Sequence, residues 1–155
     1  MATAREELTE ILLRQKLQMG PEHLKNPEES KREWLDDLAA FFRLIDEWLA
    51  KFDSELLRRN QFLVDMDESQ LGKYLAPARQ IQTPAGVIIS IIPRGRKITN
   101  ALGRVDLLAP HSRATLLRIN PGEWHFLGSS ANVSDMQTIP MTEESFIGVL
   151  KTLLA

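Results

Sequence analysis

The sequence VIISII at residues 87–92 decides the fold. Five of its six residues are β-branched and apolar, and turn-forming residues flank it at both ends, TPAG at 83–86 and PRG at 93–95. A run this short, bounded by turns on both sides, is typical of a buried strand rather than a helix. The sequence therefore predicts a central strand at this point of the chain.

Four further strand-sized segments follow at hairpin spacing. They lie at 97–102, 104–109, 114–119 and 124–127, and each junction between them contains Gly or Pro. Turn residues at nearly regular intervals are typical of antiparallel strands joined in series. We therefore expect an antiparallel meander.

Alternation along these strands predicts two different faces for the sheet, because successive side chains of a strand point in opposite directions. The apolar set assigned to the core face is Val105, Leu107, Leu117, Ile119, Trp124 and Phe126. The polar set assigned to the opposite face is Arg104, Asp106, Arg118 and His125. One face is thus expected to be a core and the other to be polar and basic.

Two helices are predicted before the sheet. The first begins at the capping box TARE (3–6) and ends at Gly20, and the second begins at Ser30 and runs at least to Phe52, or to Arg59 if the pattern continues. The apolar positions of the second helix alternate in steps of four and three. We call them the aromatic seam: Trp34, Leu38, Phe41, Ile45, Trp48 and Phe52.

The complete prediction is an α+β protein. An N-terminal helical hairpin at 1–59 is followed by a connection at 60–78 with at most one short strand. Residues 79–155 form a mainly antiparallel meander sheet of five to six strands, including a short one at 136–139, closed by a C-terminal helix with Thr142 as its N-cap. The three parts are expected to form one compact unit.

Composition limits the classes of function. The 155 residues include no cysteine, which excludes disulfides, thiolate metal sites and a cysteine nucleophile. The first residues are charged and lack the apolar core of a signal peptide, and no run approaches the roughly 18 apolar residues of a membrane span. We expect a cytoplasmic protein without a membrane partner.

Charge is distributed unevenly along the chain. Residues 1–70 contain 10 Lys and Arg against 16 Asp and Glu, whereas residues 71–155 contain 9 against 5. A basic surface of this kind can bind nucleic acid or an acidic protein, or it can pack against the acidic helical half of the same molecule or of a symmetry mate. The anion-binding candidates are Arg94, Arg96, Lys97, Arg104, Arg113 and Arg118.

Signals of catalysis are weak. A carboxylate beside an imidazole is the usual arrangement of a general base, and the residues that meet this description are Asp106, His111, Glu123 and His125. The sequence has no G-x-S-x-G nucleophile elbow and no close pair of histidines for a metal. No catalytic residue, metal or cofactor is therefore assigned.

Three functional hypotheses follow from these features. The first is a non-catalytic interaction module that forms a homodimer, or docks another protein, through the aromatic seam. The second is a binder of nucleic acid or another polyanion through the basic sheet face. The third is a hydrolase or nuclease that uses the carboxylate and histidine cluster. The interaction hypothesis requires the aromatic seam to be accessible to a partner. The polyanion hypothesis requires the basic side chains to converge on one exposed face. The enzyme hypothesis requires the carboxylates and histidines to share one pocket.

Overall fold

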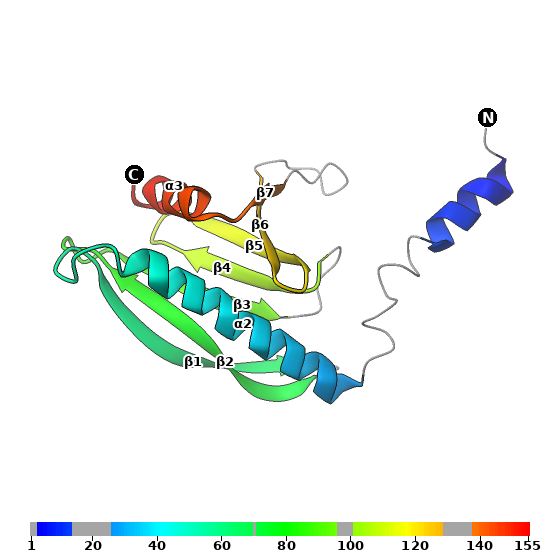
Figure 1. Ribbon diagram of the computed structural model, residues 1–155, viewed down its shortest axis with the longest axis horizontal. Helices are drawn as coiled ribbons and strands as arrows, with labels where there is room; N and C mark the ends of the chain where they lie inside the picture. Colours follow the sequence, from blue (N-terminus) through cyan, green and yellow to red (C-terminus); the bar gives the residue numbers. More distant parts are fainter. Residues whose placement is uncertain (1–2, 14–25, 70, 96–100, 129–137) are drawn as a thin grey trace.

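The computed structural model of the protein describes residues 3–13, 26–69, 71–95, 101–128 and 138–155. A helical segment at 4–13 comes first. The elements that follow are, in order (Figure 1), α2 (Pro27–Leu49), β1 (Arg58–Glu68), β2 (Gly72–Gln82), β3 (Ile88–Gly95), β4 (Arg104–Leu108), β5 (Arg113–Asn120), β6 (Glu123–Leu127), β7 (Thr138–Pro140) and α3 (Glu143–Leu154). None of the described helices is long and apolar enough to cross a membrane.

The seven strands form one antiparallel sheet in which spatial order follows chain order, from β1 to β7. The α+β class and the antiparallel meander are therefore confirmed. The predicted number of five or six strands is wrong, because two strands precede the VIISII segment. The strand predicted at 97–102 falls mostly on residues 96–100, which lie outside the described part of the chain.

The segment 60–78 was predicted to be a connection, but it forms most of a long hairpin. β1 pairs with β2 along its whole length, from Arg58 opposite Gln82 to Glu68 opposite Gly72. Gly72 has φ of 74°, a left-handed conformation that glycine adopts without steric cost, and it stands where the chain enters β2. Most of β1 is exposed on both of its faces, so its sequence lacks the alternation that reveals a half-buried strand.

Helix α2 lies closer to the N-terminus than predicted. Asn26 is its N-cap, and the Asn26 side chain accepts a hydrogen bond from the Glu29 amide at 2.8 Å, so the helix begins before Ser30. It ends at Leu49 instead of at Phe52 or beyond. Asp53 then forms a turn, because its side chain accepts from the Glu55 amide at 2.9 Å, and this turn directs the chain toward β1.

The core lies between α2 and one face of the sheet. Trp34 and Phe41 both contact Trp124 of β6, with ring centroids 5.9 and 4.5 Å apart. Four residues of the aromatic seam are fully buried here, namely Trp34, Leu38, Phe41 and Ile45. Trp34 also packs closely against Gly103. A Cβ atom at position 103 would stand 2.3 Å from the Trp34 ring.

The predicted helical hairpin is not present in the described residues. Residues 4–13 are helical, but all of them are exposed, including Leu8, Ile11 and Leu12. The apolar stripe of α2 faces the sheet, so it is not available to the first helix. The physical reason is that an apolar stripe on a helix packs equally well on a helix or on a sheet, and the sequence pattern does not distinguish the two.

Helix α3 covers the same face of the sheet as α2. Thr142 is its N-cap, as predicted, and forms a capping box with Ser145. Phe146 of α3 is fully buried and lies 5.6 Å from Trp48 of α2, measured between ring centroids. The opposite face of the sheet, which neither of these helices covers, is called the outer face below.

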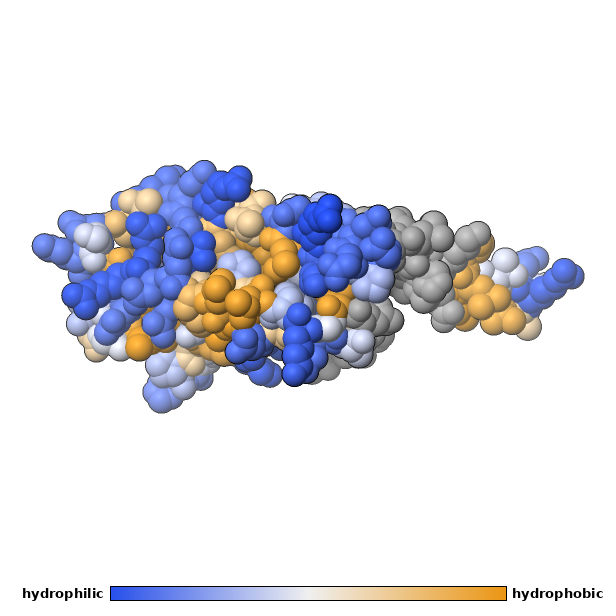
Figure 2. All heavy atoms as spheres, turned by 90° about the horizontal axis from the view of Figure 1, so that it is seen from below, coloured by the Kyte–Doolittle hydropathy of each residue, from blue (hydrophilic) through white to orange (hydrophobic). Residues whose placement is uncertain are grey.

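The β1–β2 hairpin presents different faces to α2 along its length. Near its closed end, the Trp34 side chain donates to the Tyr74 hydroxyl at 3.0 Å, and that hydroxyl donates to the Glu68 carboxylate. Near its open end, Arg79 donates to Asp46 of α2 at 3.0 and 3.1 Å. Figure 2 shows apolar side chains gathered on the lower side of the molecule, where the hairpin lies. The large exposed apolar side chains of β1 and β2 are Phe62, Leu63 and Leu75.

Candidate anion-binding site

The strand register determines which candidate residues share the outer face. Asp106 of β4 is opposite Thr115 of β5, and Arg104 is opposite Leu117. Directly opposed residues point to the same side of a sheet, so Leu117 belongs to the outer face. The prediction that Leu117 lies on the core face is therefore wrong. Its neighbours Leu116 and Arg118 therefore point toward the helices, and the predicted faces of β5 are reversed.

Arg118 is a buried ion-pair residue and not an anion-binding one. Its side chain is completely inaccessible to solvent. The guanidinium donates to Asp37 at 2.5 Å and to Glu33 at 3.3 Å, both on α2, and it also donates to the Leu102 carbonyl at 3.4 Å. Through these contacts, part of the acidic helical half of the chain neutralises part of the basic sheet half inside the molecule.

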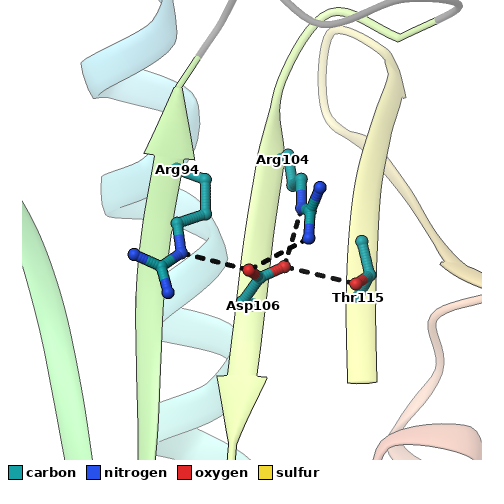
Figure 3. A network of polar contacts seen from close by, with 4 residues as sticks. All are labelled: Arg94, Arg104, Asp106 and Thr115. Atoms are coloured by element: carbon teal, nitrogen blue, oxygen red, sulfur yellow. Dashed lines mark hydrogen bonds and ion pairs between the residues drawn. The ribbon is translucent and has the colours of Figure 1, made fainter. Parts of the chain in front are cut away.

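Asp106 organises a network of polar contacts on the outer face (Figure 3). Its carboxylate accepts from Arg94 Nε at 3.1 Å and from Arg104 Nε and Nη2 at 2.8 and 3.2 Å. The Thr115 hydroxyl donates to it at 3.2 Å. Three adjacent strands, β3, β4 and β5, thus supply the four side chains. The Asp106 side chain is only 3% exposed, whereas those of Arg94 and Arg104 are 46% and 34% exposed.

The electrostatics of this network keep Asp106 ionised. Burial raises the pKa of its carboxyl group, but the hydrogen bonds from Arg104 and Arg94 outweigh burial and hold the pKa below its ordinary value. Two guanidinium charges therefore surround one carboxylate charge, and the cluster has a net charge of +1. The net positive charge is carried by the partly exposed side chains of Arg94 and Arg104.

The arrangement can bind an anion because Asp106 occupies only part of each guanidinium. In Figure 3 the terminal nitrogens of Arg94 point away from Asp106, while Nε faces the carboxylate. Arg104 uses Nε and Nη2 for Asp106, so its Nη1 is not engaged with this carboxylate. A guanidinium held in place by one carboxylate loses little side-chain entropy when it binds a second anion. Arg94 and Arg104 form what we call the arginine pair.

The other anion-binding candidates contribute less to this site. Arg113 is exposed and lies on the outer face, since it is opposite Leu108. Arg96 and Lys97 lie outside the described residues. Arg79, which the basic stretch also includes, faces α2 and stacks on Phe42 with its guanidinium carbon 4.7 Å from the ring centroid. Of the described anion-binding candidates, three therefore share the outer face, namely Arg94, Arg104 and Arg113.

The catalytic candidates do not assemble into one site. His125 contacts Glu123 through Nε2 and Thr138 through Nδ1, each at 3.0 Å. Hydrogen bonds from Asn120 and His125 lower the pKa of Glu123. Asp106, however, is engaged by arginines, and His111 is exposed in the turn between β4 and β5. Among the described residues, no three His, Asp or Glu side chains are placed to hold a metal ion.

The sequence did not indicate an open hollow where α2 ends and β1 begins. It has a volume of about 930 Å³, and Asp46, Arg58, Arg59 and Arg79 are among the residues that line it. Two of its arginines are already engaged: Arg79 binds the Asp46 carboxylate, and Arg59 donates to the Asp46 carbonyl at 3.1 Å. Arg79 also donates Nη1 to the Ala78 carbonyl at 3.1 Å, and its side chain is only 14% exposed, so it offers less to an anion than Arg94 or Arg104 does.

Most of the aromatic seam is buried inside the molecule. Four of its six residues are buried against the sheet of the same molecule, Trp48 packs on Phe146, and Phe52 lies beyond the end of α2. An interaction through its four buried residues would require α2 to leave the sheet, whereas Phe52 is 44% exposed. Compared with protein-family models, with curated proteins and with solved structures, the chain shows no significant match.

Proposed function

We propose that the protein binds nucleic acid or another polyanion through the outer face of its sheet, with the arginine pair as the central contact. The observation that supports this proposal is the buried Asp106 carboxylate, which aligns two half-exposed guanidinium groups on adjacent strands. Arginine is the side chain best suited to phosphate and carboxylate, because it offers two parallel N–H donors.

Two features extend the proposed contact beyond a single anionic group. Arg113 on β5 adds a third cation to the same face. A sheet face also allows successive phosphates of an extended chain to contact side chains on neighbouring strands. The cytoplasmic location expected from the sequence fits such a partner and stays a prediction.

The test is a titration of labelled single-stranded RNA and DNA, followed by fluorescence anisotropy at several salt concentrations. The informative variant is Arg94→Gln with Arg104→Gln, which keeps hydrogen-bonding groups and removes two charges. The matched control is Arg32→Gln with Arg43→Gln, since both of these residues are exposed on α2. A single-stranded phosphate contact contributes about 0.7 to the slope of log K against log salt, so the arginine-pair variant should lower the slope by about 1.4.

The outcome separates the proposal from a purely structural role of the network. Weaker binding with a smaller salt slope in the arginine-pair variant, and unchanged binding in the control, would support it. Equal loss in both variants would indicate non-specific attraction and would contradict it, as would absence of binding by the wild type to RNA, DNA and heparin. Binding to heparin alone would identify a polyanion other than nucleic acid.

A further inference from the structure

The two edges of the sheet differ in how well they are protected against another strand. β7 is a short edge strand, Thr138–Pro140, and its proline lacks an N–H donor. β1 is an edge strand of 11 residues that contains no proline, and its pairing with β2 shows no register shift. A long, regular edge with unpaired backbone groups is a template for pairing with another chain.

The charges of β1 are segregated by sign along the strand. Arg58 and Arg59 stand at its start, whereas Asp65, Asp67 and Glu68 stand at its end. Between them lie five uncharged residues, 60–64, and one of these, Leu63, is 62% exposed. An antiparallel partner with the same sequence would place the basic end of one strand beside the acidic end of the other.

We propose that a second copy of this chain pairs with β1, edge to edge and antiparallel, about a two-fold axis at Leu63. In this register Arg58 is opposite the partner's Glu68, and Arg59 is opposite the partner's Asp67. Two seven-stranded sheets become one continuous sheet. The occupant of the edge is thus a second copy, selected by the charge complementarity of the strand with itself.

The register follows from geometry and from charge independently. Directly opposed residues must point to the same side of the joined sheet, so only residues of the same parity can face each other. Of the registers that satisfy this condition, the one centred on Leu63 pairs all 11 residues of β1. It is also the register that places both arginines opposite acidic residues. Neighbouring registers, centred on Phe62 or Val64, lose one or both of these pairs.

The exposed apolar residues of the hairpin support the same arrangement. Leu63 would contact its own symmetry mate at the axis, and Leu75 lies beside it, on β2 opposite Asp65. Leu75 is 53% exposed. The axis would therefore join two small apolar patches of the side seen in Figure 2. Arg59 donates one N–H group to the Asp46 carbonyl, which leaves its other donors for the partner's Asp67.

Scattered charges on an edge strand usually prevent pairing, and a charge-swap experiment distinguishes that role from the proposed one. One variant is Arg59→Glu, and the other is Asp67→Lys. Each variant alone should place like charges together at both ends of the paired strands. Mixed in equal amounts, they should form a heterodimer, because the new glutamate of one chain then faces the new lysine of the other, while the unchanged Asp67 and Arg59 face each other at the opposite end.

The masses of the wild type, each variant and the equimolar mixture are measured by light scattering, with circular dichroism as the check on folding. The matched control is Arg32→Glu with Arg43→Glu on the exposed side of α2. The proposal predicts twice the monomer mass for the wild type, the control and the mixture, and the monomer mass for each variant alone. Amide hydrogen exchange of β1 should slow in the dimer.

Three results would overturn the proposal. The first is a monomeric wild type at concentrations that reach the millimolar range. The second is a dimer whose mass is unchanged in both charge variants, because the interface would then lie elsewhere. The third is a mixture that stays monomeric although each variant is folded. Failure here would leave the proposed polyanion binding untouched, because the arginine pair lies on β3 and β4.

Discussion

Replacing Asp37 with alanine tests the ion pair that joins α2 to the sheet. Asp37 accepts from the buried Arg118 guanidinium at 2.5 Å and from the Gly122 amide at 3.0 Å. Removing one partner of a buried ion pair costs about 3–5 kcal/mol, because the other charge stays buried without compensation. Glu33 still contacts Arg118 at 3.3 Å, so we expect the lower end of this range, about 3 kcal/mol.

Glu33→Ala should cost much less than Asp37→Ala. The Glu33 side chain is 26% exposed and its contact with Arg118 is longer, so a loss of about 1 kcal/mol is expected. Asp36→Ala is the matched control, since Asp36 is an exposed neighbour on the same helix. For a chain of this length, about 3 kcal/mol corresponds to a fall of roughly 6–12 °C in Tm.

The assay is urea unfolding monitored by tryptophan fluorescence. This signal is suitable because Trp34 lies beside this ion pair. The free energies of unfolding are compared among the three variants and the wild type, and an unchanged m-value shows that the unfolded states are alike. The reasoning is refuted if Asp37→Ala lies within about 0.5 kcal/mol of Asp36→Ala, the range of ordinary surface substitutions.

Three further predictions concern other parts of the molecule. Gly103→Ala should lower the free energy of unfolding by about 1–3 kcal/mol, because its Cβ would overlap the Trp34 ring, and thermal unfolding checks this. Asp106→Asn should destabilise the protein at neutral pH. Because the folded pKa of Asp106 is lowered, that difference should begin to shrink as the pH falls through the ordinary value of about 3.9 and should be lost below the lowered folded value, as measured by urea unfolding at several pH values. Leu63→Lys should convert the proposed dimer to a monomer in light scattering, while Leu44→Lys on α2 should leave the mass unchanged.

The sequence predicts the second half of the fold better than the first. From Ile88 onward, short apolar runs separated by Gly and Pro identify β3 to β6, and Thr142 identifies the start of α3. β1 and β2 were missed because β1 is exposed on both faces and its hairpin turns different sides toward α2. A strand without one consistently buried face has no two-residue period to detect.

The site was predicted only in part, and β5 explains why. Arg104 and Asp106 were both assigned to the polar face of the sheet, and the structure adds Arg94 to them. Arg118 was placed on the same face because alternation with Leu117 and Ile119 assigned it there. Its strand instead buries Leu116 and Arg118 together, since Asp37 and Glu33 on α2 provide partners for a buried cation. Alternation alone cannot show that a charged residue has a partner inside the protein.

The meander order of the sheet also determines the sequence of events in folding. Every strand pairs with its neighbour in the chain, so each pairing closes only a short loop. The contacts of α2 with Arg118, in contrast, connect residues 81 and 85 positions apart. Local pairings form faster than distant ones. The strands should therefore acquire slow amide exchange first during refolding, and the docking of α2 should complete the core last.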